Sequence, residues 1–335
     1  MKYCFAYLFY VFNTKNEPPV CLIGSNYGEK RSDNALALFD YIRDQNQHEI
    51  YFVENRPKEE DAIRRGSLKS FIYFFRSEGV FFSHSLSDIL PQMHTLPFLF
   101  RCLKKPRKVF IQHGVTAMTG LKSVDRYIRK IMATVDFVIA TSRIEKALLI
   151  KLGATDKSVR ITGFPVHDTA VFGKREKKCL VFFTWRKSGN INIEKKAVVN
   201  DPEIIKNLHE HQYELIVHYH DMNSHENYRI GVDGQKVVDN GSLREAINEA
   251  QILITDNSSV AWEFFYRERD VIFYNPSPDT RVDLRQAGFH VADSIHELSV
   301  ILVSALAEKL PLTDVQDFFS FKDRKNCERV YNLIQ

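Results

Sequence analysis

The chain has little cysteine, and what it has would not build a disulfide scaffold. Its 335 residues include 5 cysteines, which are scattered as Cys4, Cys21, Cys102, Cys179 and Cys327. Their number is odd, and no two of them form a Cys-x-x-C pair. Small domains held together by disulfides carry dense, even sets of cysteines. We therefore exclude that class and expect reduced, buried thiols in a cytosolic protein.

An excess of charge of one sign is also lacking. Lys and Arg together number 46 and Asp and Glu number 42, so the formal net charge is only +4. Nucleic-acid-binding domains usually carry a concentrated basic surface, so this balance predicts no nucleic acid partner. Hydrophobic residues make up 44% of the chain, which excludes a disordered protein. We find no repeat of fixed period and no low-complexity stretch.

The apolar and aromatic run at residues 1–12 is too short to span a bilayer and has no small-residue cleavage site. Two interpretations are open: a buried element of the core, or a segment resting at the headgroup boundary. The basic run at 101–108 fits a solvated loop, but it would also attract anionic lipid by about 1 kcal/mol per charge. Residues 1–15 are therefore a candidate membrane-interfacial segment.

Short apolar runs alternate with helical patterns along the chain, which is typical of parallel strands covered on both faces. The expected strands are 20–24, 49–53, 79–83, 108–112, 137–141, 158–162, 179–184, 213–219, 251–255 and 271–274. The expected helices are 32–46, 67–76, 123–134, 143–152, 202–209, 242–250, 258–266 and 294–309. The pattern predicts the α/β class, with two successive open sheets.

The alternation stops between residues 164 and 178, where Pro165, Gly173 and a charged run at 174–178 follow one another. We predict an N-terminal domain over 16–165, a linker over 166–178 and a C-terminal domain over 179–335. Ligands of such sheets bind outside the carboxyl ends of the strands. With two Rossmann-like domains facing a cleft, that cleft is the expected site.

His113 and Gly114 follow one of the expected strands directly. A histidine at the carboxyl end of a parallel strand points to the ligand-binding edge, and near neutral pH it can act as a general base. Gly114 lets a ligand or another backbone segment approach closely. A packed, purely structural histidine is the alternative at this position.

A run of small polar residues, Thr255 to Ser259, follows another expected strand and opens a helix. Free backbone N–H groups at a helix start bind phosphate, and hydroxyl groups add donors. Simple N-capping would need only one such residue, so the run favours anion binding. Glu263, one turn into that helix, could accept a hydrogen bond from a ribose hydroxyl.

Two further groups lie in the second half. His218 and His220 share one face of an expected strand. They could bind a metal, although nothing obvious completes four ligands, and one catalytic or anion-binding histidine beside a packed one is the other interpretation. Arg186 carries a fork of donors suited to phosphate, or it is an ordinary surface arginine.

Taken together, these motifs resemble the CDP-glycerol:glycerophosphotransferase family, whose members prime and polymerise teichoic acids and related capsule polymers. The resemblance runs from about Gly24 to Tyr274. In chain order it is carried by Gly24–Ser25–Asn26–Tyr27–Gly28 with Ser32–Asp33–Asn34, Gln112–His113–Gly114, Thr162–Gly163–Phe164–Pro165–Val166–His167–Asp168, Thr184–Trp185–Arg186, and Ile254–Thr255–Asp256–Asn257–Ser258–Ser259–Val260.

The chain departs from the family pattern at a few positions. Val166 stands where the family has Arg in its Thr–Gly–x–Pro–Arg–x–Asp segment, and whether His167 compensates is open. The loop after Gly114 reads Val–Thr–Ala–Met instead of the usual Thr–Pro–Leu–Lys, and His218 stands where a basic residue is common. These departures bear on the acceptor and the donor's polyol more than on the reaction type.

The resemblance implies a GT-B-like fold and transfer of glycerol phosphate or ribitol phosphate from a CDP-polyol to an acceptor hydroxyl, with release of CMP. We expect His113 as the general base and His220 as a second catalytic residue. The expected donor-binding residues are Thr184, Arg186, Thr255, Asp256, Ser258, Ser259 and Glu263. The expected acceptor-side residues are Gly28, Asp33, Asn34 and Gly114.

The implied partners are the CDP-polyol, a lipid-linked or polysaccharide acceptor and the membrane surface, for a cytoplasmic protein peripheral at the inner face of the cell membrane. No metal or other cofactor is expected, because neutral donors, arginine and helix dipoles can stabilise charge on the diphosphate. Two other functions are open: a sugar transferase of the same fold using a UDP- or CMP-sugar, and a non-enzymatic nucleotide-binding or scaffolding protein.

Overall fold

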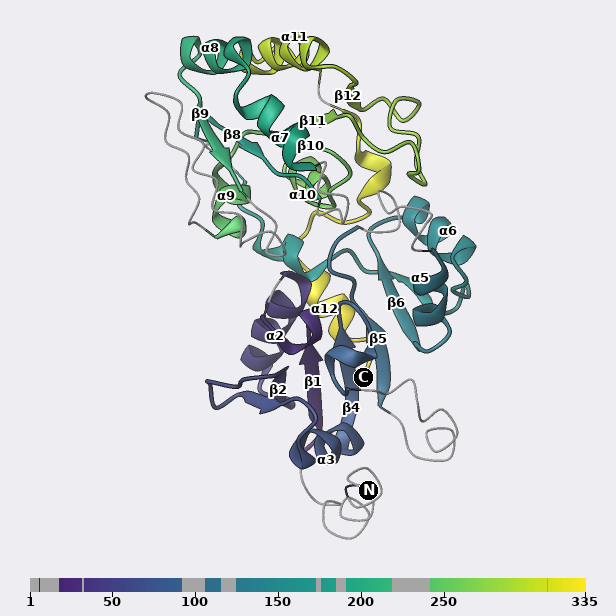
Figure 1. Ribbon diagram of the computed structural model, residues 1–335. Helices are drawn as coiled ribbons and strands as arrows, with labels where there is room; N and C mark the ends of the chain where they lie inside the picture. Colours follow the sequence, from purple (N-terminus) through teal and green to yellow (C-terminus); the bar gives the residue numbers. More distant parts are fainter. Residues whose placement is uncertain are drawn as a thin grey trace. The chain divides into compact units, whose positions relative to one another are not determined.

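The computed structural model describes residues 6, 18–31, 33–91, 106–115, 125–172, 176–184, 191–218, 242–311 and 313–335 (Figure 1). The chain forms two compact units. Of the described residues, those within 1–117, 124–169 and 316–335 form the first unit, and those within 170–315 form the second.

The first unit is built on a parallel sheet with the strand order β3-β2-β1-β4-β5-β6-β7. Its strands are β1 (Val20–Gly24), β2 (Glu49–Glu54), β3 (Ala62–Arg64), β4 (Ser77–Phe82), β5 (Arg107–Phe110), β6 (Phe137–Ala140) and β7 (Val159–Ile161). Its α-helices are α2 (Asp33–Gln45), α3 (Leu68–Arg76), α5 (Asp125–Met132), α6 (Arg143–Lys151) and α12 (Asn326–Tyr331). Short 3-10 helices are η1 (Asn26–Gly28), η2 (Leu86–Asp88), η6 (Pro165–Thr169) and η8 (Gln316–Phe318).

Local sequence explains these elements well. All five residues of β1 are buried, as expected of a central parallel strand covered on both faces. Helix α3 begins after Ser67, whose side chain accepts from Ser70 N, and α6 begins after Ser142, whose side chain accepts from Glu145 N. One apolar cluster joins the strands and helices of this unit, with Leu22 among its fully buried members.

The second unit has a parallel sheet with the strand order β12-β11-β10-β8-β9. Its strands are β8 (Lys178–Val181), β9 (Glu214–Val217), β10 (Ile252–Thr255), β11 (Asp270–Tyr274) and β12 (His290–Ala292). Its α-helices are α7 (Ile191–Val199), α8 (Pro202–Glu210), α9 (Leu243–Glu249), α10 (Val260–Tyr266) and α11 (Ile295–Leu306). Helices α8 and α11 contact each other (Figure 1). A second apolar cluster of buried side chains joins these helices to the sheet.

Each sheet contains one point at which the strand order reverses. In the first sheet, β1 lies between β2 and β4, and in the second, β8 lies between β9 and β10. At such a switch point the loops leaving neighbouring strands diverge and leave a crevice at the carboxyl ends. The sites described below lie at these two edges.

Every strand and helix expected from the sequence is present, with boundaries shifted by a few residues. The sequence did not indicate β3, β12, α7 or α12. Strands β3 and β12 are three-residue strands at the sheet edges, and Ala62–Ile63–Arg64 is too short to make an apolar run. Short edge strands are common in sheets because they limit pairing with other chains.

The C-terminal segment 316–335 belongs to the first unit, which differs from the expected C-terminal domain over 179–335. Helix α12 contacts α2 and η6, so segments from opposite ends of the chain lie side by side (Figure 1). The Asp168 carboxylate accepts from Asn326 N at 3.1 Å and from Cys327 N at 2.7 Å, which caps α12. The amino-acid composition of residues 316–335 does not indicate that this segment packs against the first unit.

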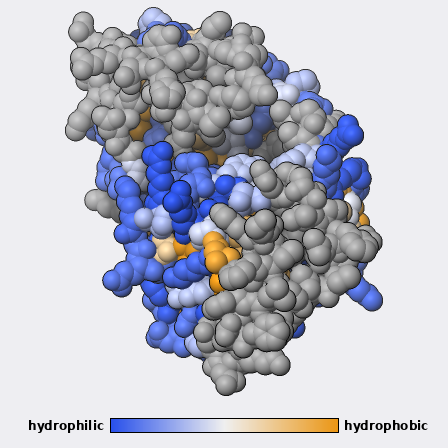
Figure 2. All heavy atoms as spheres, turned by 60° about the horizontal axis from the view of Figure 1, so that its bottom comes forward, coloured by the Kyte–Doolittle hydropathy of each residue, from blue (hydrophilic) through white to orange (hydrophobic). Residues whose placement is uncertain are grey.

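No helix within the described ranges is both long and apolar enough to cross a membrane. The candidate interfacial segment 1–15, apart from Ala6, lies outside the described residues, as does 101–105 of the basic run. On the face drawn in Figure 2, the described surface is mostly hydrophilic, with a small apolar area. Cys21, Cys179 and Cys327 are free and buried, as expected, whereas Cys4 and Cys102 are outside the described part.

Candidate active site

Two histidines meet at the carboxyl edge of the first sheet. His84 follows β4 and His113 follows β5, and these neighbouring strands are in register with Phe82 opposite Phe110. Their imidazole rings stack with centroids 4.5 Å apart and an angle of 5° between the planes. The sequence predicted His113 at this edge, and the structure adds His84.

Both imidazoles are held in the neutral form. Desolvation lowers the pKa of His84 and of His113 to about 4 each. At His113, the neighbouring His84 lowers the pKa further, since two stacked imidazolium ions would repel, and the Asp33 carboxylate acts in the opposite direction. The His113 residue is nevertheless exposed at the surface, so solvent offsets part of this desolvation and a substrate can reach the residue. His113 can therefore accept a proton at neutral pH.

A buried carboxylate organises the loops on either side of this edge. Asp88 accepts hydrogen bonds from Tyr27 N at 2.9 Å, Ser83 N at 3.1 Å and His84 N at 2.8 Å. Burial raises the pKa of Asp88, although these N–H groups act in the opposite direction. A Cβ at Gly24 would lie 2.7 Å from the Asp88 carbonyl oxygen, so only glycine fits there. Asp88 thus fixes the loops after β1 and β4 together.

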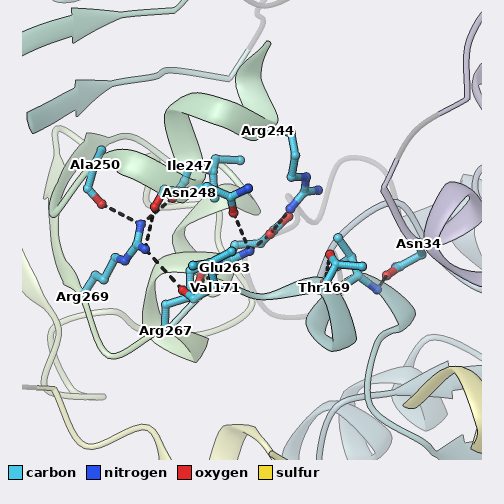
Figure 3. Close-up of polar contacts among 11 residues, drawn as sticks. Asn34, Thr169, Val171, Arg244, Ile247, Asn248, Ala250, Glu263, Arg267 and Arg269 are labelled. Atoms are coloured by element: carbon cyan, nitrogen blue, oxygen red, sulfur yellow. Dashed lines mark hydrogen bonds and ion pairs between the residues drawn. The ribbon is translucent and has the colours of Figure 1, made fainter. Parts of the chain in front are cut away.

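Asn34 fixes the backbone just before His113. Its Nδ2 donates to Ile111 O at 3.0 Å and Gln112 O at 3.1 Å. Its Oδ1 accepts from Val166 N at 3.1 Å, the contact of Asn34 that is drawn in Figure 3. The side chain is buried, with its polar atoms bonded to backbone groups. This arrangement favours a positioning role for Asn34. Its direct contact with an acceptor stays a prediction.

Gln112 is a second residue that fixes the backbone next to His113. Its backbone has φ 52°, a left-handed conformation that a residue with a Cβ rarely adopts. Its Nε2 donates to Ile139 O at 2.8 Å and to Glu145 Oε1 at 3.1 Å. Glu145 also accepts from Thr141 N and Oγ1, at 2.6 and 2.9 Å, and burial raises the pKa of Glu145 to about 7.

The other expected acceptor-side residues lie at the same edge. Gly28 ends η1 with φ +82°, and a Cβ there would lie 3.0 Å from the Arg65 side chain. Asp33 opens α2 with φ 50°, close enough to influence the charge of His113. Gly114 directly follows His113. The structure therefore brings Gly28, Asp33, Asn34, His113 and Gly114 to one edge of the first unit.

The segment that departs from the family pattern is buried. Val166 and His167 are 5% and 1% exposed, respectively. The His167 ring lies against Phe164 and Phe319, with centroid distances of 5.7 and 5.5 Å. Neither side chain presents a charge at the surface. The sequence had left open whether His167 replaces that arginine, and its burial does not favour this.

In the second unit, Thr184 and Asp256 join the two strands at the switch point. Asp256 Oδ1 accepts from Thr184 N at 2.8 Å and from Thr184 Oγ1 at 2.9 Å. Thr255 Oγ1 donates to Phe182 O at 2.6 Å. Thr184, Thr255 and Asp256 therefore hold the carboxyl ends of β8 and β10 together, and their contact with a donor stays a prediction.

Some polar side chains at the start of α10 are already hydrogen-bonded within the protein. Ser258 Oγ accepts from Val260 N at 3.2 Å, and Asn257 Oδ1 accepts from Ser277 N at 2.7 Å. Ser259 is the N-terminal cap residue, with no side-chain cap hydrogen bond. Ser258 and Ser259 lie on the loop between β10 and α10, just before the helix that the sequence had predicted to begin at Ser258, and their contact with a donor stays a prediction.

Glu263 takes part in an ion-pair cluster that the sequence did not indicate. Its carboxylate contacts the Arg244 guanidinium and lies 3.1 Å from Arg267 Nη1, and Arg267 Nη2 donates to Asn248 at 3.3 Å (Figure 3). Arg267 is fully buried, and burial lowers its pKa while Glu263 raises it. The proposed contact of Glu263 with a ribose stays a prediction.

Arg269 fixes the end of α9 nearby. Its Nη1 donates to Ile247 O at 2.5 Å and Ala250 O at 2.7 Å, and its Nη2 donates to Asn248 O at 2.7 Å (Figure 3). These are carbonyl groups that a helix end leaves without internal partners. Arg267 and Arg269 thus hold α9 and α10 together.

Arg186 and His220 lie outside the described residues, so their roles stay predictions. Within the part of the chain that is described, no group of three or more His, Cys, Asp or Glu side chains could hold a metal ion. His84 and Asp88 are the residues that sequence reasoning missed. A signal existed for His84, since an expected strand ends just before it, as one does before His113.

Comparison with known proteins decides the family. The family model described as "CDP-Glycerol:Poly(glycerophosphate) glycerophosphotransferase" matches residues 6–335. The chain belongs to this family. One curated relative is the minor teichoic acid biosynthesis protein GgaB of Bacillus subtilis (strain 168). It is 23% identical to this chain over 97% of the chain's length. The chain spans 40% of the length of GgaB.

Solved structures show the same fold. The wall teichoic acid polymerase TagF matches with a TM-score of 0.75 and 13% identity, over 99% of this chain and 93% of that chain. The UDP-GlcNAc 2-epimerase of Methanocaldococcus jannaschii matches with a TM-score of 0.57 and 13% identity, over 94% and 99%. The prediction of a GT-B-like α/β fold with two Rossmann-like units is thereby confirmed.

Proposed function

We propose that this chain transfers glycerol phosphate or ribitol phosphate from a CDP-polyol to a hydroxyl group of a lipid-linked or polysaccharide acceptor, in teichoic acid or capsule polymer synthesis. The observation that carries the proposal is the family match over residues 6–335. The name of GgaB refers to teichoic acid biosynthesis, and one TagF structure is of a variant soaked with CDPG, which adds support.

The neutral imidazole of His113 suits the first chemical demand of this reaction. The acceptor hydroxyl gives its proton to His113 as its oxygen attacks the phosphorus that carries the polyol. A new P–O bond forms at this phosphorus, its bond to the bridging oxygen of the diphosphate breaks, and CMP leaves with that oxygen. A positioned general base contributes about 10²- to 10⁴-fold to such a step.

Charge on the diphosphate is the second demand, because it must be stabilised as the leaving group departs. Ser258 and Ser259 offer hydroxyl groups at the edge of the second sheet, and Thr184 and Asp256 hold that edge together. Arg186 and His220 are assigned to the same task from the family motif. We propose that these groups suffice without a resident metal ion, so that activity should survive chelation with EDTA.

The test is a screen of donors against acceptors with the product identified by mass. CDP-glycerol, CDP-ribitol, a UDP-sugar and a CMP-sugar are each offered with lipid-linked and glycan acceptors. Release of CMP with gain of one polyol phosphate on the acceptor supports the proposal. Release of UDP, or of CMP with sugar transfer, would instead support the sugar transferase. Donor binding without turnover on any acceptor would support a non-enzymatic role.

Association with the membrane is a separate part of the proposal. It rests on the aromatic run at residues 1–12 and the basic run at 101–108, both at the sequence level. The expected result is that replacing aromatic residues of the first run by serine reduces sedimentation with anionic liposomes while circular dichroism stays unchanged. Unchanged sedimentation contradicts the interfacial interpretation, and a lost fold favours a core element.

A further inference from the structure

Tyr27, in η1 of the first unit, has a backbone conformation that is costly for a bulky side chain. Its φ is 53° and its ψ is 27°, in the left-handed region that glycine and asparagine favour. Asn26 before it has φ 47°, and Gly28 after it has φ +82°. Asparagine or glycine would fit position 27 with less strain, so the tyrosine ring there calls for an explanation.

The surrounding structure holds Tyr27 in this conformation from several sides. Tyr27 N donates to the buried Asp88 carboxylate at 2.9 Å, and Tyr27 O accepts from Asn55 Nδ2 at 3.0 Å. Asn26 N donates to His84 Nδ1 at 3.3 Å. Strained residues that are fixed in this way cluster at functional sites.

The strained backbone does not serve to bury the ring. Tyr27 is 43% exposed, and Tyr127, at the start of α5, is 47% exposed. Their hydroxyl oxygens lie 3.0 Å apart and share one hydrogen bond. That pair leaves one hydroxyl hydrogen and several lone pairs for a ligand, while the rings offer apolar surface.

The two tyrosines continue the row formed by the histidines. The Tyr27 ring centroid lies 5.5 Å from that of His84, and the His84 ring stacks on His113 at 4.5 Å. His84 therefore lies between Tyr27 and His113, and an acceptor that binds on the tyrosines would extend past this one ring to reach the general base. All four residues belong to the first unit, which also contains the residues expected on the acceptor side.

We propose that Tyr27 and Tyr127 form an acceptor platform, which binds the polyhydroxylated end of the acceptor and presents one of its hydroxyl groups to His113. The shared chemistry is a carbon skeleton with adjacent hydroxyl groups, found in a sugar ring and in an open-chain polyol. The inference rests on the proposed function, because an acceptor hydroxyl is needed. Both tyrosines are positioning residues and take no part in proton transfer.

The experiment measures affinity for two acceptor probes by saturation-transfer NMR, with CDP-glycerol present: octyl glucopyranoside for the sugar ring and a synthetic glycerol phosphate trimer for the polyol. We expect the wild-type protein to bind at least one probe. Tyr27→Asn, which suits the left-handed backbone, should weaken that binding at least about tenfold, since an aromatic contact and a hydrogen bond are lost. Tyr27→Phe and Tyr127→Phe should weaken it about threefold, because only one hydrogen bond is affected.

Thermal unfolding and donor binding separate this role from a structural one. Tyr27→Asn should unfold at the same temperature as wild type or higher, and its dissociation constant for CDP-glycerol should not change. Glu308→Asn is the matched control, because Glu308 is an exposed left-handed residue of the second unit, with φ 56°. It should leave binding of both probes unchanged.

Wild-type affinity in Tyr27→Asn would overturn the acceptor platform, and so would the absence of binding of either probe to the wild-type protein. Neither result depends on whether CMP is released from CDP-glycerol, which is the separate test of the proposed function. The probe that binds more tightly shows whether the platform takes a sugar ring or an open-chain polyol.

Discussion

His84 and His113 lie ring on ring, with centroids 4.5 Å apart and planes 5° apart, at the carboxyl ends of two neighbouring strands. Two protonated imidazoles would repel strongly at this distance, so the stack favours the neutral form of both. Because a general base must be unprotonated to act, the relationship prepares His113 for catalysis at neutral and mildly acidic pH.

The first prediction concerns the pH profile of turnover. With the pKa of His113 lowered to about 4, kcat/KM of the wild-type enzyme should not fall until the pH is well below 6. Replacing His84 by phenylalanine keeps an aromatic neighbour and removes its charge, so the acidic limb should move to higher pH. His290→Phe, in the second unit, is the control and should leave the limb in place. A wild-type limb near 6.5, or no movement in His84→Phe, would contradict this account.

The second prediction concerns stability against pH at Glu145. Burial raises the pKa of Glu145 from 4.5 to about 7, so the folded state holds this proton more tightly than the unfolded state does. Its contribution is fully present below about pH 4.5 and is lost as the pH rises through 7, which amounts to about 3 kcal/mol. Urea unfolding of Glu145→Gln should therefore lose less stability than wild type between pH 5 and 8. Parallel curves for the two proteins would refute the assignment.

The third prediction tests Asn34 as a positioning residue. In Asn34→Asp, a carboxylate oxygen replaces the Nδ2 group that donates to Ile111 O and Gln112 O. The variant should lose at least about 2 kcal/mol of unfolding free energy, because two buried acceptors lose their donor. Asn200→Asp makes the same change at an exposed position and should stay within about 0.5 kcal/mol. Equal stabilities of the two variants would show that Asn34 does not fix this loop.

The fourth prediction separates backbone strain from steric conflict at two glycines. Gly163 has φ +73°, and a Cβ there would lie 2.1 Å from Asn326 Oδ1, whereas Gly288 has φ +78° with nothing near its Cβ. Gly288→Ala should cost about 1–2 kcal/mol, from strain alone. Gly163→Ala should cost at least about 1 kcal/mol more, because the buried Asn326 side chain at the start of α12 must shift. If chemical denaturation finds the same loss of unfolding free energy in both variants, the contact with Asn326 does not restrict position 163.

Much of the fold could be predicted from the sequence because buried parallel strands are short apolar runs, and β1 at Val20–Gly24 matched its expected bounds. The edge strand β3 and the return of α12 could not be predicted. Their positions depend on contacts with residues far away in the chain, such as the Asp168 carboxylate that caps α12.

Candidate site residues could be predicted where polar or titratable side chains come soon after a strand, as at His113, Asp256 and Ser258. Asp88 was missed because its role in fixing the loops depends on backbone N–H groups that converge on its carboxylate in the folded chain. One of these groups belongs to Tyr27, in the loop after another strand. Tyr27 stood inside a resembling motif, but its strained backbone and its contact with Tyr127 exist only in three dimensions.

The most direct test of the central claim is the rate of CMP release from CDP-glycerol, measured for the wild-type protein and for His113→Ala with the same acceptor. We predict that the wild-type protein releases CMP as the acceptor gains polyol phosphate. His113→Ala should be at least about 100-fold slower, the lower range for loss of a general base, with an unchanged dissociation constant for CDP-glycerol. Near-normal turnover in His113→Ala, or no CMP release by the wild-type protein with any acceptor, would contradict the account.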